Sequence, residues 1–426
     1  MTTIDLGEVT HEEAAPAVPL NVRRLATALL AVVAVAGASA LGGSARPAPP
    51  AVRPLWTVPL TYGASFRLGD DAAYVAAPAF DGARISAHDL ATGATRWSVT
   101  IDEDVSGSEP VPIAGVVLIG VDPSQVEKQA DAVYWMQWSR ATVALDPATG
   151  AERWRTAGEI TSIENGLGLV SEFGDDAALI RLRLVRLADG HELWNVPTPG
   201  TSRWTVTADG DPVTASAAGE IRLVRRADGA VRRPGRLPWP AGTAIYSVGR
   251  YVSVVRQATG VTTTTVYRPG DLRELWRADQ AAGYLITCGA LICEAAPGGV
   301  SARDAETGEV LWKYPGLPDV REAGPSRLLL NDGPVGTQLL VDAATGRMLG
   351  APALGTAVTG GPDGSLLILR GTQTPYLRSK VIRFDLTTGA QRTLGTTAPI
   401  GEGFCSAAGN YLACPHEGTL TVTAVG

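Results

Sequence analysis

The chain has 426 residues, of which 45% are hydrophobic and 19% charged, with 49 glycines and 29 prolines. This composition excludes a coiled coil and an acidic disordered chain, and it favours many short strands joined by turns. The 43 acidic and 36 basic residues give a net charge of −7. A nucleic-acid-binding protein usually carries a basic excess, so that class is not expected.

The N-terminal region predicts a membrane anchor. Residues 1–22 form a polar tail, and Arg23 and Arg24 are followed by an uncharged apolar run at 25–43. A helix over that run would span about 28 Å, close to the hydrocarbon core of a bilayer. The arginine pair favours an N-terminus in the cytoplasm. We therefore expect a cytoplasmic tail at 1–22, a transmembrane signal anchor at 23–43 and a Pro/Ala-rich linker at 44–54.

The alternative for the same segment is a cleaved signal peptide. Ala38-Ser39-Ala40 then forms the cleavage site. Both hypotheses place residues 55–426 outside the cytoplasm. The first predicts a single-pass protein of the cell membrane, and the second predicts a secreted protein.

The body of the chain carries a recurring turn. Three segments share the frame A-x-D-x-x-T-G-x-x-x-W, at 87–97, 144–154 and 302–312, and weaker copies lie between and after them. Glycines at the turn position recur roughly every 40 residues: Gly93, Gly150, Gly190, Gly229, Gly270, Gly308, Gly346 and Gly389. A period near 40 with four short strands per unit is typical of a β-propeller.

The residue types of this turn predict a role for each repeated position of the frame within the chain. The aspartate accepts hydrogen bonds from the backbone two residues on, and the glycine supplies the positive φ of the reversal. The tryptophan lies on the outgoing strand, where its face can pack against the neighbouring blade. The repeat residues are Asp89, Gly93, Trp97, Asp146, Gly150, Trp154, Trp194, Asp304, Gly308 and Trp312.

The two ends of the body predict how the ring closes. The C-terminal segment supplies three strands and stops where the turn is due, while Trp56 lies in a strand that no turn precedes. We expect the strand at 54–60 to complete the last blade, which removes the exposed sheet edges. Eight turns and the closing unit give nine quartets, but the unit at 201–240 lacks the tryptophan. We predict eight blades, with seven and nine as alternatives.

An insertion interrupts the repeat at 122–140. Tyr134, Met136 and Trp138 alternate with Trp135 and Gln137, which predicts an extended strand with aromatic residues on both faces. One hypothesis is a long hairpin that covers the ring. The other is a protruding contact surface for a partner, with Tyr134, Trp135 and Trp138 as its candidate residues.

The four cysteines form two close pairs, Cys288 with Cys293 and Cys405 with Cys414. Each pair brackets a short turn between apolar stretches, so the partners face each other across a hairpin. An exported body permits disulfides, and we predict both local pairings. Zinc binding and free thiols are the alternatives.

The repeat frame resembles the tryptophan-docking repeat of the pyrroloquinoline-quinone (PQQ)-like β-propellers, over roughly residues 55–426. That superfamily includes quinoprotein dehydrogenases and a non-catalytic outer-membrane assembly factor. For the enzymes, the resemblance implies PQQ and Ca²⁺ near the ring axis, a Cys-Cys dipeptide stacked on the quinone and an acidic base. This sequence has no Cys-Cys dipeptide, so no cofactor is expected.

Together these features predict an all-β chain, a PQQ-like propeller preceded by one transmembrane helix. We expect no catalytic, cofactor or metal residues, and a binding or scaffolding module that contacts an envelope protein or a cell-wall component. The alternatives are a PQQ- and Ca²⁺-dependent oxidoreductase and a ligand sensor that signals through the cytoplasmic tail.

Overall fold

The computed structural model describes residues 52–105, 107–129, 133–258, 261–279, 283–324, 326–333, 336–374, 377–400 and 404–426. Residues 50–426 form one compact unit. The predicted tail, anchor and cleavage site, and the linker up to residue 51, lie outside the described residues. Within the described residues, no helix has both the length and the apolar character needed to cross a bilayer.

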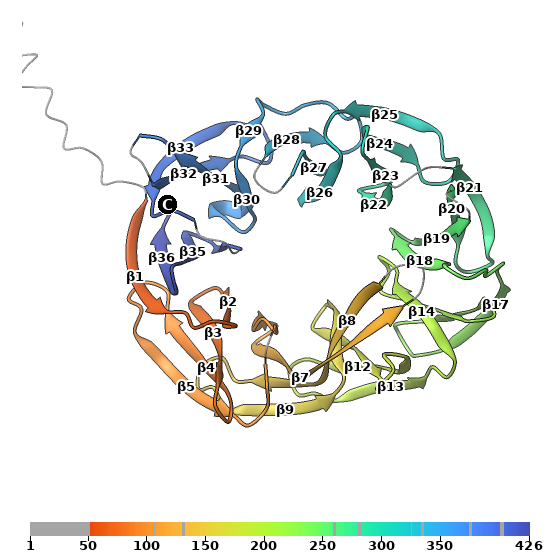
Figure 1. Cartoon of the computed structure of the whole chain (residues 1–426), viewed down its shortest axis with the longest axis horizontal. Helices are drawn as coiled ribbons and strands as arrows, with labels where there is room; N and C mark the ends of the chain where they lie inside the picture. The colour runs from red at the N-terminus through yellow and green to blue at the C-terminus, as the bar shows by residue number, and fades with distance from the viewer. Residues whose placement is uncertain are drawn as a thin grey trace, which may run out of the picture. The chain divides into compact units, whose positions relative to one another are not determined.

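Nine four-stranded antiparallel sheets make up the described residues of this unit, and Figure 1 shows them arranged as the blades of a propeller. The blades are numbered along the chain, and blade 1 comprises β2 (Ser65–Leu68), β3 (Ala72–Ala79), β4 (Gly82–Asp89) and β5 (Thr95–Ile101). Blade 2 comprises β6 (Val111–Ile113), β7 (Val116–Gln129), β8 (Val133–Leu145) and β9 (Glu152–Ala157). Blade 3 comprises β10 (Glu159–Glu164), β11 (Leu167–Phe173), β12 (Leu179–Arg186) and β13 (Glu192–Pro197).

Blade 4 comprises β14 (Thr201–Val206), β15 (Pro212–Ser216), β16 (Glu220–Val224) and β17 (Val231–Arg236). Blade 5 comprises β18 (Ala244–Val248), β19 (Tyr251–Ala258), β20 (Val261–Arg268) and β21 (Arg273–Asp279). Blade 6 comprises β22 (Tyr284–Cys288), β23 (Leu291–Ala296), β24 (Gly299–Asp304) and β25 (Val310–Pro315).

Blades 7 and 8 comprise β26 (Asp319–Gly324), β27 (Arg327–Asn331), β28 (Thr337–Asp342) and β29 (Ala353–Leu354); and β30 (Thr356–Val358), β31 (Leu366–Thr372), β32 (Arg378–Phe384) and β33 (Gln391–Thr397), with a single 3₁₀ turn at Pro362–Gly364 among the described residues. Blade 9 joins both ends of the propeller, because β34 (Ser406–Ala408), β35 (Tyr411–His416) and β36 (Thr419–Ala424) are completed by β1 (Arg53–Pro59).

The closing strand pairs with the last strand of the chain. Trp56 lies opposite Val422 and Arg53 opposite Ala424 in the antiparallel register of β1 and β36. The expected closure is therefore present, and it begins one residue earlier than the predicted strand. β1 is the fourth, outermost strand of this blade, and its pairing covers the outer edge of β36 that an open ring would leave unpaired.

The core lies between the blades. Leu328, Leu329 and Leu330 of β27 are all buried, yet they serve two different junctions. Leu328 and Leu330 pack into the cluster shared with blade 6, and Leu329 packs into the cluster shared with blade 8. Side chains alternate across a strand, so a middle strand that is covered on both sides becomes apolar throughout. Each junction between neighbouring blades holds one such cluster in the described residues.

The prediction of eight blades is wrong, since the described residues form nine. The segment at 201–240, which lacks the tryptophan, folds as the complete blade 4. Val213, Ala215 and Ile221 bury its apolar face against blade 5. Alternating apolar residues are sufficient to form a sheet here, and the tryptophan affects only the junction.

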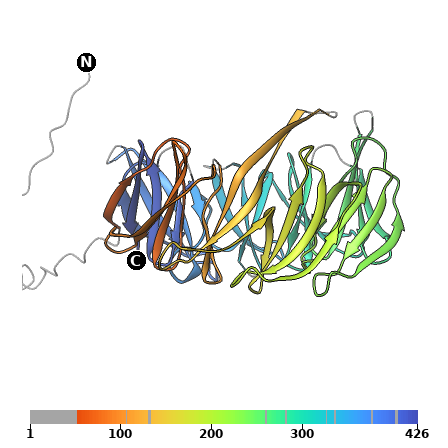
Figure 2. The ribbon, with the colours of Figure 1, turned by 90° about the horizontal axis from the view of Figure 1, so that it is seen from below.

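The strand order defines two faces of the ring. The Asp-x-x-Thr-Gly turns link the third and fourth strands of a blade and lie on one face, the turn face. Hairpins between the second and third strands lie on the opposite, hairpin face, together with the links from each blade to the next. The β7–β8 ribbon rises from the hairpin face (Figure 2). Arg53 begins β1 and Ala424 ends β36 at the turn face.

Candidate functional site

The repeated turn is held by its aspartate. Asp89 Oδ1 accepts hydrogen bonds from the amides of Ala91 and Thr92, at 3.1 and 3.0 Å, and from the Thr92 hydroxyl at 2.9 Å. Gly93 then adopts a φ of +74°, a left-handed conformation that carries little cost only for glycine. Asp146 and Asp304 make the same three bonds in blades 2 and 6.

The tryptophan of each repeat docks on the turn of the next blade. Trp97 donates a 2.8 Å hydrogen bond from Nε1 to the carbonyl of Pro147. Its ring lies so close to Gly150 that a Cβ there would come within 2.5 Å of the Trp97 Cε3 atom. Five further junctions show the same arrangement, in which Trp56, Trp154, Trp194, Trp276 and Trp312 lie on Gly93, Gly190, Gly229, Gly308 and Gly346.

Blades 4 and 5 meet without a docked tryptophan. Arg233 occupies the tryptophan position of blade 4, and the turn of blade 5 places Leu272 at φ +55° where other blades have glycine. The predicted turn glycine, Gly270, is two residues away from this position. The Leu272 amide bonds the Arg268 carbonyl at 2.9 Å, as Gly93 does with Asp89. This junction therefore lacks both the tryptophan and the turn glycine, and without a docked ring the turn position accommodates a leucine side chain.

Blades 7 and 8 meet through backbone alone. Gly350 occupies the tryptophan position, and a Cβ on it would lie 2.1 Å from the Gly389 carbonyl oxygen. A Cβ on Gly389 would likewise collide with the Leu349 carbonyl at 2.1 Å. Two glycines thus replace the ring-on-glycine contact by close backbone packing.

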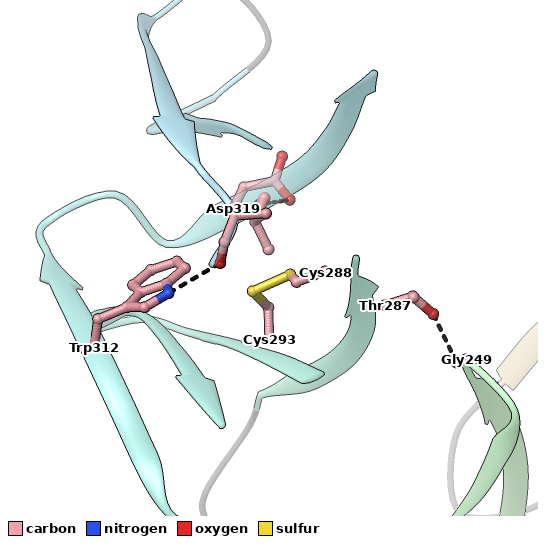
Figure 3. Close-up of a disulfide and its surroundings, with 8 residues drawn as sticks. Gly249, Thr287, Cys288, Cys293, Trp312 and Asp319 are labelled. Carbon is pink, nitrogen blue, oxygen red and sulfur yellow. Dashed lines mark hydrogen bonds between the residues drawn. A yellow bond between two sulfur atoms is a disulfide. The ribbon is translucent and has the colours of Figure 1, made fainter. Parts of the chain in front are cut away.

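Both predicted disulfides are present, Cys288–Cys293 and Cys405–Cys414. The first closes the β22–β23 hairpin on the blade 6 side of the junction with blade 7 (Figure 3). Beside it, Trp312 donates to the Ala343 carbonyl at 3.1 Å, and the Thr287 hydroxyl accepts from the Gly249 amide at 2.6 Å. The second disulfide lies in the closing blade. The first disulfide therefore reinforces blade 6, and the second reinforces the blade that closes the ring.

Trp138 does not belong to an exposed partner surface, contrary to the prediction. Its side chain is 4% exposed and packs on Phe173, with the ring centroids 6.0 Å apart. The β7–β8 ribbon packs against β10 and β11 of blade 3, and this contact covers Trp138. Tyr134 and Trp135 lie in β8, but their side chains are outside the described part of the structure.

A pocket of about 420 Å³ lies at the base of the ribbon and is lined by Trp138, Ser139 and Glu159, among other residues. Glu159 accepts a 3.2 Å hydrogen bond from the Ser139 amide, and burial raises the pKa of this carboxyl group. Glu109, which also lines the pocket, is paired with Arg67. The pocket therefore offers one desolvated carboxyl group.

Two further ionisable residues, Arg226 and His88, have structural roles in the junctions and blades. Arg226 is buried, and its carbonyl accepts from Trp194 while its amide donates to Asp211 at 2.7 Å. His88, in blade 1, is buried, and burial lowers the pKa of its imidazole. Within the described ranges, no group of three or more His, Cys, Asp or Glu residues is placed to hold a metal ion.

The structure adds exposed aromatic residues that the repeat pattern did not indicate. Tyr62, Phe80 and Phe404 are almost fully exposed. They lie in the β1–β2 link, the β3–β4 hairpin and the approach to β34, which all belong to the hairpin face of blades 9 and 1. A Cβ on Gly63 would touch Pro78 at 3.4 Å, so the first two segments are neighbours. The sequence signal is an aromatic residue beside a turn glycine, in TYG and FDG.

Comparison with known proteins agrees with this geometry. A family model described as "Outer membrane protein assembly factor BamB" matches residues 81–267, which contain blades 2, 3 and 4. The fold is a PQQ-like β-propeller. A search of curated proteins found no match.

Three solved structures illustrate the likeness of this PQQ-like propeller to known folds. BamB from Moraxella catarrhalis has 16% identity and a TM-score of 0.39, with 88% of this chain and 97% of that chain covered. The computationally designed Ika8 protein has 16% identity and a TM-score of 0.48, covering 76% and 98%. A eukaryotic initiation factor has 10% identity and a TM-score of 0.50, covering 84% and 94%. At such identities the likeness concerns the fold alone.

Proposed function

We propose that this propeller is a non-catalytic binding or scaffolding module of the cell envelope, held at the membrane by residues 23–43. Its partner is an envelope protein that contacts the hairpin face of blades 9 and 1. The exposure of Tyr62, Phe80 and Phe404 on that one face carries the proposal. Aromatic residues are enriched at protein interfaces, and three of them exposed on neighbouring blades favour a contact surface.

The ends of the closing strands support this use of the hairpin face. Arg53 begins β1 and Ala424 ends β36 at the turn face, so neither strand end interrupts the hairpin face. The description of the matched family model, an outer-membrane assembly factor, supports a role in holding other envelope proteins.

A double variant tests the proposal. Tyr62→Ser with Phe80→Ser should abolish co-purification of the partner from native membranes after mild cross-linking, without lowering the melting temperature. The matched control is Leu193→Ser with Leu311→Ser, which removes two partly exposed apolar side chains from the outer strands β13 and β25. Equal partner recovery with both double variants would contradict the use of this face.

The anchor needs its own test. Deletion of residues 25–43 should release the propeller from carbonate-washed membranes, while the full chain stays in the pellet. A full chain that is extracted by carbonate would contradict the anchor.

A further inference from the structure

Arg321 is a cation with few partners. It lies in β26, and its Nη2 donates a single marginal hydrogen bond, 3.5 Å, to the Ala357 carbonyl. Its Nε is buried and has no acceptor among the described residues. Burial lowers the pKa of this guanidinium. A buried charge normally has both an ion partner and full hydrogen bonding, because its desolvation is costly.

Asp319 does not fill this gap. It attracts Arg321 through space, but within the described residues the guanidinium forms no ion pair, and its one hydrogen bond goes to the Ala357 carbonyl. Asp319 instead accepts hydrogen bonds from the Tyr284 hydroxyl and, at 2.9 Å, from the Val320 amide.

Arg321 lines a pocket of about 380 Å³. The pocket is bordered by residues of five consecutive blades, from blade 7 through blade 9 to blade 2. Arg67 of β2 is its second cation, and Thr359 and Ser406 supply hydroxyl groups. No aspartate or glutamate is among its described lining residues; Glu109, the partner of Arg67, belongs to the neighbouring pocket.

We propose that this pocket binds a small organic anion through a carboxylate or phosphate group that pairs with Arg321. The planar guanidinium donates two parallel hydrogen bonds to either oxyanion. Arg67, whose charge is balanced by Glu109, borders the pocket as a second guanidinium, and the hydroxyls of Thr359 and Ser406 are additional donors. The volume suits a ligand of small-metabolite size. The proposal rests on Arg321 and not on the exposed aromatic residues, so it stands independently of the proposed partner surface.

Calorimetry on the full-length chain tests the proposal, with inorganic phosphate and succinate as the two probes. Saturable binding of phosphate alone identifies a phosphate group as the ligand, and binding of succinate alone identifies a carboxylate. Binding of both supports a general oxyanion site. Binding of neither at millimolar concentration overturns the proposal.

Three variants separate ligand binding from a structural role. Arg321→Met should weaken binding roughly tenfold or more, since hydrogen bonds to a charged group are lost. It should also raise the melting temperature of the ligand-free protein, because a partly desolvated charge without an ion partner is removed. Arg321→Lys should keep weak binding, and Arg236→Gln, which changes an exposed arginine paired with Glu220, should change nothing. Unchanged binding in both Arg321 variants would overturn the assignment.

Discussion

The indole of Trp56 lies directly on the turn glycine Gly93, so closely that a Cβ on the glycine would come within 2.5 Å of the Trp56 Cγ atom. Trp56 also donates a 2.9 Å hydrogen bond to the Leu90 carbonyl. The strand that carries it, β1, pairs with the last strand of the chain. One side chain therefore links the closing blade to the blade that follows it.

The contact between Trp56 and Gly93 predicts that a single methyl group added at Gly93 destabilises the fold. Gly93→Ala places a Cβ into the Trp56 ring and forces alanine to a φ of +74°. The backbone conformation costs about 1–2 kcal/mol, and overpacking adds about 1–3 kcal/mol. Gly166→Ala is the matched control, since Gly166 has a φ of +73° and nothing within 4 Å of its Cβ position. Urea denaturation should show the larger loss for Gly93→Ala, and equal losses would contradict the docking account.

The repeat predicts much of this fold because its residues have local roles. An aspartate that caps its own turn and a glycine at positive φ act within five residues, so their pattern is visible without the structure. The closure is also predictable, since a strand with no turn before it and a blade one strand short complement each other. The cysteine pairs follow from hairpins of short separation.

The remaining features depend on contacts that are distant in the sequence. Leu272 takes the glycine position of blade 5 only because blade 4 brings no tryptophan to it. The outer strand of blade 7, Ala353–Leu354, is too short to be visible as a period. Trp138 alternates like an exposed ribbon residue, yet Phe173 of blade 3 covers it. Arg321 can be recognised as a candidate only in the structure, where residues of five blades border the pocket that it lines.

The turn aspartates predict a loss of stability in acid. Arg96, and then Thr92, hold the pKa of Asp89 at about 2, and Arg153 does the same for Asp146. A carboxyl group whose folded pKa lies below its unfolded value of 3.8 stabilises the fold above pH 4, and this contribution is lost as the pH falls toward 2. The melting temperature should therefore drop between pH 4 and pH 2. The double variant Asp89→Asn with Asp146→Asn should flatten that drop, and an unchanged slope would count against the turns as its source.

Each disulfide is expected to contribute about 2 kcal/mol, because both close short loops and the entropic gain grows slowly with loop length. Cys288→Ser with Cys293→Ser, and Cys405→Ser with Cys414→Ser, should each lower the denaturation midpoint. A reductant should lower the wild-type midpoint, and in each double variant it should produce only the loss from the remaining disulfide. A wild-type midpoint that is insensitive to reductant would show that the disulfides contribute nothing.

If the propeller is non-catalytic, as proposed, it should not respond to PQQ and Ca²⁺. We expect the melting temperature of the full chain to be the same with and without PQQ plus Ca²⁺. A ligand present at 100 times its dissociation constant stabilises the native state by about 2.7 kcal/mol, an easily visible shift. A clear rise would favour the oxidoreductase, and dye-linked oxidation of alcohols and sugars would then be the next assay.

The most direct test of the binding role uses a photo-cross-linking amino acid in the native membrane. It is placed at Phe80 on the hairpin face and, as the control, at the exposed Ala148 on the turn face. The account predicts one discrete cross-linked envelope protein from position 80 and none from position 148. Cross-linking of that protein from position 148 alone, or from neither position, would contradict a partner bound at the hairpin face.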